Sequence, residues 1–320
     1  GRVHHLKKMN NGTNFLPYAT SLRMGPLGYQ SDAQSSISVS YNNLTSYAQS
    51  LYDALTQPYP PYAAIGLTDK NKPIQLSNAL LQIENEFYGT IRPKQPVQYG
   101  ERPLLALNRR GVEYVEVRCI DLDPYQDIGI DKETVALIDT FLLFCLLSES
   151  SNDSTEENRS NSENQYLIAE RGRDPSLKLT RDKDYVSVKS WGTDVIEACQ
   201  PFALRLDEAN HTNIHTQSLA NALKCLNNPE ETPSARVLRD IEGKHNGSYF
   251  DFVMSLSSGY TERLKHDKLS REILIKHNNN AASSSIKQQN VEQDEQLDFE
   301  EFRKEYISQE ASRIILEEHN

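Results

Sequence analysis

Charged side chains interrupt two otherwise apolar segments at alternate positions. The segment LLQIENEFYGTIRPK carries Glu84, Glu86 and Tyr88, and the later segment GVEYVEVRCID carries Glu116 and Arg118. Successive side chains of a β-strand point to opposite faces, so Glu116 and Arg118 would lie side by side on one surface. Carboxylates bind hard cations, and arginine binds phosphate or carboxylate bidentately. The spacing indicates either a site for metal and phosphate or the solvated face of an ordinary antiparallel sheet.

The same two segments predict the strands that would hold these side chains. Apolar residues alternate with the charged ones and would form the opposite, buried face of each strand: Leu81, Ile83, Phe87, Val115, Val117 and Cys119. Glu84 and Glu86 have a second interpretation, in which they form structural ion pairs with Arg92 or Lys94. Alternation alone favours neither interpretation.

Helical periodicity predicts packing helices around the two strands. Apolar residues keep helical spacing over residues 41–55, and a helix there must end before Pro58. Another helix follows an N-cap at Asp131 and extends to about Leu147. Its apolar residues occur nearly all round, so we expect it to be buried against the back of the sheet. Strands combined with packing helices indicate an α+β fold.

The composition favours a globular protein of the cytoplasm. The 320 residues are 37% hydrophobic, which suffices for a core, and the net charge of −11 argues against a nucleic-acid partner. The longest apolar run, residues 141–147, is too short to span a membrane, and no signal-peptide pattern opens the sequence. The four cysteines lie far apart, which favours reduced core residues over disulfides.

Shifts in composition predict five regions along the chain. Residues 1–148 belong to a sheet domain, 149–165 form a polar loop or insertion, 166–277 form a helical supporting region, 278–296 form a flexible linker, and 297–320 form an amphipathic terminal helix. The predicted loop is rich in Ser, Asn and Glu and too polar to pack. The abrupt polar start of the sequence indicates the middle of a loop or a trimmed tag.

Three longer runs resemble a known enzyme family. The runs FLPYATSLRMGPLGY, LLQIENEFYGTIRPK and RGVEYVEVRCIDLDP occur in the order found in glutamate-cysteine ligases of the proteobacterial type, also called γ-glutamylcysteine synthetases. The resemblance covers residues 15–239 and weakens after residue 150. It implies a fold like that of glutamine synthetase, with an antiparallel sheet curved around the site. It also implies that this chain is the carboxyl-terminal portion of such an enzyme, with an incomplete sheet.

The resemblance further implies a reaction and site residues. The family uses ATP to join the γ-carboxylate of L-glutamate to L-cysteine through γ-glutamyl phosphate, with Mg²⁺ as the metal, in the first step of glutathione synthesis. Glu116 then corresponds to a magnesium-binding carboxylate, and Arg118 to the catalytic arginine that faces the transferred phosphate. Arg23, Tyr29 and Tyr88 correspond to positions around the cysteine substrate. The two glutamates of the first segment remain weaker candidates.

In such a family, further metal-binding carboxylates and much of the glutamate site belong to an upstream portion. We therefore expect this chain alone to be inactive. Two alternatives stay open. The chain could belong to another carboxylate-amine ligase of the same fold, or it could be a noncatalytic binding or regulatory fragment that pairs with a separate amino-terminal chain.

Overall fold

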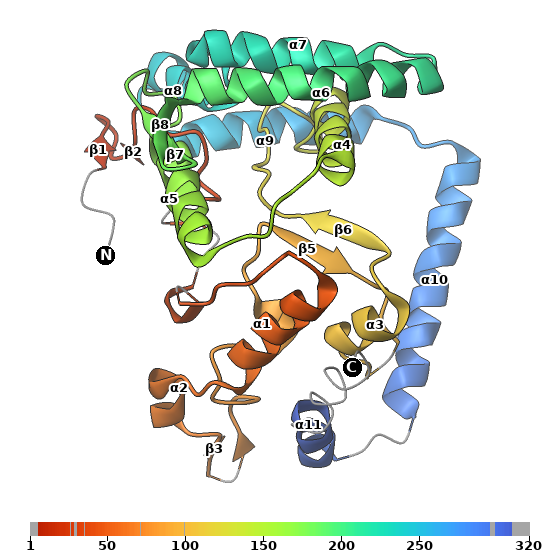
Figure 1. Cartoon of the computed structure of the whole chain (residues 1–320). Helices are drawn as coiled ribbons and strands as arrows, with labels where there is room; N and C mark the ends of the chain where they lie inside the picture. Colours follow the sequence, from red (N-terminus) through yellow and green to blue (C-terminus); the bar gives the residue numbers. More distant parts are fainter. Residues whose placement is uncertain are drawn as a thin grey trace.

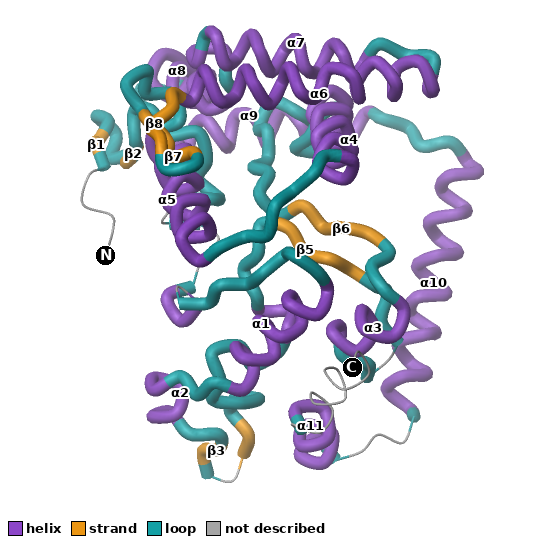
Figure 2. Tube along the Cα trace, in the orientation of Figure 1, coloured by secondary structure: helices purple, strands orange, loops and turns teal. Residues whose placement is uncertain are grey.

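The computed structural model describes residues 6–25, 27–28, 31–34, 36–70, 72–98, 100–294 and 298–308. Helices dominate these residues, and the strands form only short antiparallel pairs (Figure 2). One strand pair lies in the middle of the molecule, between a lower group of helices and an upper layer of longer ones (Figure 1). The predicted α+β class is confirmed.

The lower group is built around α1 (Leu44–Thr56). Asn43 caps this helix, because its side chain accepts a hydrogen bond from Ser46 N at 2.8 Å. The helix ends before Pro58, which confirms the prediction for this stretch. The other elements of the group are α2 (Pro60–Ile65), α3 (Pro103–Arg110), the paired strands β3 (Thr68–Asp69) and β4 (Lys72–Pro73), and the 3-10 turns η1 (Asp32–Gln34) and η2 (Glu84–Glu86).

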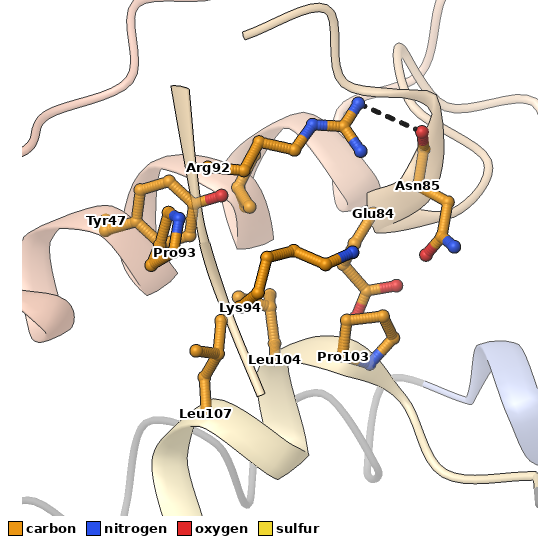
Figure 3. Close-up of a pocket in the computed structure, with 10 residues that line it drawn as sticks. Tyr47, Glu84, Asn85, Arg92, Pro93, Lys94, Pro103, Leu104 and Leu107 are labelled. Carbon is orange, nitrogen blue, oxygen red and sulfur yellow. Dashed lines mark hydrogen bonds between the residues drawn. The ribbon is translucent and has the colours of Figure 1, made fainter. Parts of the chain in front are cut away.

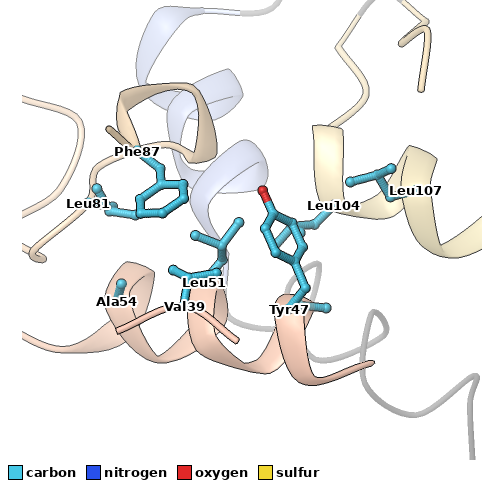
Figure 4. Packing of buried hydrophobic residues seen from close by; sticks show 9 residues of the cluster. Val39, Tyr47, Leu51, Ala54, Leu81, Phe87, Leu104 and Leu107 are labelled. Carbon is cyan, nitrogen blue, oxygen red and sulfur yellow. The ribbon is translucent and has the colours of Figure 1, made fainter. Parts of the chain in front are cut away.

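A hydrophobic core joins α1, α3 and the segment between them (Figure 4). Leu51, Leu81 and Leu104 are each at most 2% exposed and come from three separate parts of the sequence. Burying one leucine side chain stabilises a fold by about 2 kcal/mol relative to exposing it. The cluster therefore fixes the position of α3 and of the segment that leads into the central strands. Its other buried members are Val39, Tyr47, Ala48, Ala54, Phe87 and Leu107.

The strand predicted over residues 80–88 is wrong. Leu80 N and Leu81 N donate to the carbonyls of Gln57 and Ala54, so this backbone binds the end of α1 instead of a neighbouring strand. The η2 turn follows almost at once, and the acidic residues there do not share a strand face. The apolar residues of this segment are buried by packing onto α1, which produces alternation in the sequence without a pleated strand.

The strand predicted around Glu116 is confirmed as β6 (Tyr114–Val117). Its partner is β5 (Ile91–Lys94), which lies at the end of the first charged segment. These two strands form the central pair in Figure 1. Besides β3 and β4, two further described strand pairs are peripheral: β1 (Lys7–Lys8) with β2 (Asn14–Phe15), and β7 (Lys178–Arg181) with β8 (Asp184–Ser187).

Asp131 caps α4 (Lys132–Leu147) as predicted, and its side chain accepts a hydrogen bond from Thr134 N at 2.7 Å. The predicted burial of α4 against the back of the sheet is wrong. The helix packs on α6 and α7 through Leu137 and Phe144, while other apolar residues such as Leu146 stay exposed. An apolar composition on all sides does not specify which side is covered or by what.

The four cysteines are free, as predicted, but they are not all core residues. Cys199 is buried in the upper layer beside α4, whereas Cys119 and Cys145 are exposed. Cys119 follows β6, in which no residue is fully buried, and Cys145 lies near the end of α4, where residues 145–147 are all exposed. The predicted burial is therefore wrong for these two cysteines.

The polar loop predicted over residues 149–165 is helical from Thr155 onward, as part of α5 (Thr155–Arg171). Ser154 caps the helix, and two glutamates in its first turn suit the positive end of the helix dipole. Asn164 is buried and exchanges two hydrogen bonds, at 3.0 and 2.7 Å, with the backbone of Thr180 in β7. A polar sequence packs here because its buried amide both donates to and accepts from the backbone of β7.

The upper layer contains four long helices: α6 (Val188–Asn210), α7 (Ile214–Asn227), α8 (Pro233–Lys244) and α9 (Tyr249–His266), with the turn η3 (Pro229–Glu231) before α8. Asp207 joins the end of α6 to the start of α7. Its carboxylate accepts hydrogen bonds from His215 N at 3.0 Å and Thr216 N at 2.9 Å, and it contacts the ring of His215 at 2.8 Å. Burial alone would raise the pKa of Asp207, but these donors outweigh it and lower the pKa to about 2.

Acidification is expected to destabilise the junction between α6 and α7. A carboxyl group whose pKa is lowered by folding stabilises the protein above its unfolded pKa of about 4, and the contribution is lost as the pH falls toward the folded pKa of about 2. The melting temperature of the wild type should therefore fall more steeply in this window than that of Asp207→Asn. Parallel melting-temperature profiles for the two proteins would contradict the assignment.

The helix α10 (Arg271–Gln293) runs along one side of the molecule without a buried residue (Figure 1). Residues 278–293, predicted as part of a flexible linker, are helical instead, because they continue a helix that Ser270 caps and that begins with the helix formers Arg, Glu and Leu. Residues 295–297 lie outside the described part.

The predicted terminal helix is described as α11 (Phe299–Ile307), and residues 309–320 lie outside the description. Arg303 Nη1 attaches α11 to the lower group through the Leu76 carbonyl at 2.9 Å. Across the described ranges, we find no helix with the length and apolar character needed to cross a membrane.

Candidate functional site

The central strand pair determines which charged side chains share a surface. Arg92 lies opposite Glu116, and Lys94 lies opposite Tyr114. Residues opposite one another in an antiparallel pair project to the same face, so these four side chains share one face of the sheet. Arg92 is buried against the lower group, whereas Val115 on the apolar face is 44% exposed. The expected arrangement, with the apolar face buried, is therefore reversed at Val115.

Glu116 lies between two cations on this face. Its Oε2 atom is 3.9 Å from Lys94 Nζ and 4.0 Å from Arg118 Nη1. The contact to Arg118 confirms that the two residues are neighbours on one strand face. Both distances are at the limit for an ion pair, and the Glu116 side chain is 40% exposed, so neither cation binds this carboxylate tightly. A carboxylate held in this way can still accept a hard cation.

Arg23 reaches the same site from a segment almost one hundred positions upstream. Its Nε atom donates to the carbonyl of Arg118 at 2.7 Å, and its backbone N donates to Asp121 Oδ1 at 3.0 Å. The hydroxyl of Ser21 also donates to the carboxylate of Asp121. The structure therefore places Arg23 beside the backbone of Arg118, whose side chain is next to Glu116.

Asp121 is a site residue that the sequence analysis did not single out. Its carboxylate accepts hydrogen bonds from the Ser21 hydroxyl and the Arg23 backbone N, so it determines where the Arg23 side chain starts. Its position directly after the second predicted strand was a usable signal, because polar residues at strand ends often hold neighbouring loops.

Of the two tyrosines predicted beside the cysteine substrate, the structure describes only Tyr88. The backbone N of Tyr88 donates to Gln34 Oε1 at 2.8 Å, and the residue is 41% exposed. Two positions later, the Thr90 carbonyl accepts a hydrogen bond from Arg118 N at 2.8 Å, which places the Tyr88 segment beside the site. Tyr29 lies outside the described residues.

The weaker candidate Glu84 has the geometry of a structural ion pair. Its Oε1 atom is 3.0 Å from Arg102 Nε, and both side chains are buried. The partner is Arg102 and not Arg92 or Lys94, because η2 turns the carboxylate toward the start of α3.

The second weaker candidate, Glu86, folds back on its own segment. Its Oε2 atom accepts a hydrogen bond from Gln82 N at 2.8 Å. The described contact therefore stabilises the η2 turn and leaves no metal-ligand arrangement with Glu116.

A cavity of about 20 Å³ lies between β5 and the lower group (Figure 3). Arg92 and Lys94 extend over it from β5, and Arg92 Nη2 donates to the Asn85 carbonyl at 3.1 Å. Among the described residues, the buried Oε2 atom of Glu84 has no hydrogen-bond partner. The cavity has room for about one water molecule, which could satisfy that atom, but not for a nucleotide or an amino acid.

The donor set fits one ligand of a magnesium site and not a complete site. Within the ranges that the structure covers, no three His, Cys, Asp or Glu side chains gather in the manner of a metal centre. Mg²⁺ is usually held by one or two carboxylates together with substrate phosphates and water. Glu116 can supply one such carboxylate, and the adjacent Arg118 can bind phosphate oxygens.

These features describe an α+β protein whose central strands present a carboxylate and arginines suited to a cation and phosphate oxygens. The chain belongs to the glutamate-cysteine ligase family, whose family model matches residues 1–168. It is 43% identical over 312 residues to a glutamate-cysteine ligase of Saccharophagus degradans, covering 97% of this chain and 59% of that relative. It is 41% identical to the one of Pseudomonas entomophila, covering 94% and 57%.

A solved structure agrees with this membership. Glutamate-cysteine ligase from Francisella tularensis, determined in complex with AMP, matches with a TM-score of 0.89 at 28% identity, over 98% of this chain and 61% of that one. The chain thus spans less than two thirds of the length of these relatives.

Proposed function

We propose that the protein containing this chain joins the γ-carboxylate of L-glutamate to L-cysteine with ATP, through γ-glutamyl phosphate, in the first step of glutathione synthesis. The observation that carries the proposal is the Glu116 carboxylate between Lys94 and Arg118, in a chain of the glutamate-cysteine ligase family. The AMP bound to the Francisella tularensis enzyme supports adenine-nucleotide use. A cytoplasmic enzyme acting on small molecules is consistent with this chemistry.

Each candidate side chain has a distinct role in the proposed reaction. Glu116 would hold Mg²⁺, which when bound neutralises charge on the ATP phosphates. Arg118 would bind the oxygens of the transferred phosphate, and positioning with charge neutralisation is most of what phosphoryl transfer requires of a protein. Arg23 would bind the carboxylate of cysteine, with Tyr29 and Tyr88 offering an apolar ring and a polar hydroxyl beside it.

The present chain supplies only part of that site. It spans 59% of the Saccharophagus degradans relative, and its described residues supply one candidate carboxylate for Mg²⁺. We infer that the 320-residue chain alone does not catalyse the proposed ligation. The intact mass of the native protein separates the alternatives. A longer polypeptide supports a complete ligase, whereas a mass equal to this chain favours a fragment that pairs with a separate amino-terminal chain.

Substitution of Arg23 by lysine tests the role in cysteine binding. Lysine keeps the charge but cannot donate to the Arg118 carbonyl and also present a planar fork to a carboxylate. In the full-length ligase, the KM for cysteine should rise about tenfold, as expected from the loss of one charged hydrogen bond. The KM for ATP should stay unchanged.

The matched control is Arg159→Lys, because Arg159 is exposed on α5 and pairs only with Glu163 among the described contacts. This control should leave both KM values unchanged. An equal rise in the KM for cysteine and for ATP after Arg23→Lys would contradict a role of Arg23 in binding cysteine and favour a general defect.

Substrate identity is tested separately. Unchanged turnover with other amines in place of cysteine would favour a different carboxylate-amine ligase.

A further inference from the structure

Residues 17–23, which carry Arg23 into the site, are held by the end of α5 and the residues after it. Thr20 N donates to the Ala169 carbonyl at 2.9 Å, and its hydroxyl donates to the Ile168 carbonyl at 2.6 Å. The fit is close, because a Cβ atom added at Gly172 would lie 2.7 Å from Thr20 Cγ2. The backbone of residues 17–23 is therefore docked onto a part of the chain about 150 positions away.

The buried guanidinium of Arg173 adds side-chain hydrogen bonds to this contact. Its Nη2 atom donates to the Pro17 carbonyl at 2.5 Å, and its Nε atom donates to the Ala19 carbonyl at 3.2 Å. Its Nη1 atom pairs with Glu230 Oε1 at 3.1 Å, and the side chain is 4% exposed. The backbone N of Arg173 adds a bond to the Tyr18 carbonyl at 3.1 Å. One residue therefore binds three consecutive carbonyls of the segment.

The planar geometry of arginine is required for this arrangement. The two carbonyls and the carboxylate are bound through three different nitrogens of one guanidinium, which a lysine ammonium at the same position cannot reproduce. Burial lowers the pKa of Arg173 while Glu230 opposes that effect, and arginine stays charged at any physiological pH. A buried charge is tolerated only when its donors are paired, so the segment and the guanidinium stabilise each other.

The other end of the segment is fixed at the site itself. Asp121 accepts from Arg23 N, and the Arg118 carbonyl accepts from Arg23 Nε. Residues 17–23 are thus held by Arg173 at one end and by Asp121 at the other. A shift of the Arg173 end would move the backbone from which the Arg23 side chain extends.

We propose that Arg173 is a positioning residue that holds residues 17–23 so that Arg23 is correctly placed for the amino-acid carboxylate of the acceptor substrate. The inference rests on the proposed function for the role of Arg23, and Arg173 lies outside residues 1–168 matched by the family model. Arg173 does not touch the reacting groups. It acts through the carbonyls of Pro17 and Ala19 and the short backbone between them and Arg23.

Amide hydrogen exchange tests the positioning directly, without reference to catalysis. In Arg173→Lys, the amides of Thr20 and Ser21, which donate to the Ala169 carbonyl, should exchange about tenfold faster. The matched control is Arg171→Lys, because Arg171 lies two positions away, is half-exposed and pairs with Asp174. Exchange in the control should equal that in the wild type. Unchanged exchange in Arg173→Lys would overturn the proposal.

Kinetics of the full-length ligase test the consequence at the site. Arg173→Lys should raise the KM for cysteine about tenfold while the KM for ATP changes less than about twofold, since a displaced clamp affects one substrate. A role in stability alone would lower the active fraction, and hence the apparent kcat, without changing either KM. If Arg173→Lys does not fold, Glu230→Gln keeps the guanidinium and should give the same pattern at smaller size.

Different results would contradict the role of Arg23 in cysteine binding and the positioning role of Arg173. Faster exchange in Arg173→Lys with no change in the KM for cysteine in either Arg23→Lys or Arg173→Lys would overturn the role of Arg23 in the proposed function. A raised KM for cysteine in Arg23→Lys with no change in Arg173→Lys would overturn the positioning role alone.

Discussion

Glu116→Gln is expected to lower turnover at limiting Mg²⁺ by about 100-fold, the upper end of the effect that a change to residues supporting a metal site usually has. Glutamine keeps the shape of the side chain but removes the charge that would hold the cation. The melting temperature should not change measurably, because Glu116 is half-exposed and its contacts to Lys94 and Arg118 are long. The measurement is the initial rate of ADP release against Mg²⁺ concentration in the full-length ligase.

The matched control is Glu113→Gln, which removes the same charge three positions earlier, at an exposed residue just before β6. Its magnesium dependence should match that of the wild type. If Glu116→Gln turns over normally at limiting Mg²⁺, Glu116 is not a metal ligand, and the carboxylate then belongs to the solvated face of an ordinary sheet. If both variants lower turnover at limiting Mg²⁺ equally, the effect reflects the overall charge near β6.

Arg102→Met should lower the free energy of unfolding by about 3 kcal/mol, because it leaves the buried carboxylate of Glu84 without its partner. The loss should be visible as a lower midpoint of urea denaturation at unchanged slope. The effect should be on stability and not on substrate affinity, since Glu84 faces the core beside Leu104 and Pro103 (Figure 3).

A double substitution separates the ion pair from its surroundings. Glu84→Gln with Arg102→Met removes both charges, and the double variant should be more stable than Arg102→Met alone, because no uncompensated charge stays buried. The exposed pair Arg205–Glu208 provides the control, and Glu208→Gln should leave the midpoint unchanged. A double variant less stable than Arg102→Met would show that Glu84 contributes through contacts other than this pair.

The sequence was most informative where a local signal decided the structure. The predicted cap at Asp131 acts within one helical turn, and the helix predicted from residue 41 ends before Pro58 as the missing proline N–H requires. The strand around Glu116 alternates without interruption, and the contact between Glu116 and Arg118 follows from that alternation alone.

The errors occur where partners distant in sequence determine the structure. The acidic residues at 84 and 86 alternate as in a strand, yet the backbone before them binds the end of α1. The stretch 149–165 is too polar to predict a packed helix, and the buried amide of Asn164 becomes favourable only when β7 supplies its backbone partners. Neither partner can be recognised from the local sequence.

The candidate site was likewise only partly predictable from the sequence. Glu116 and Arg118 could be paired from spacing, and Arg23 could be placed beside them only through the family resemblance of its sequence run. Asp121 and Arg173 were not singled out, because their importance lies in backbone carbonyls and amides that they bind, and a sequence contains no direct signal for such contacts.

The bonds between Arg173 and the carbonyls of Pro17 and Ala19 also bear on when the site forms during synthesis. Arg173 is 156 positions from Pro17 and 154 positions from Ala19 along the chain. At about 5 to 20 residues per second, a ribosome needs roughly 8 to 31 seconds to make the intervening chain. Arg23 therefore emerges long before the guanidinium that fastens its segment. The acceptor side of the site is completed only after Arg173 has been made, so a nascent chain released before Arg173 would carry Arg23 without the contacts that position it.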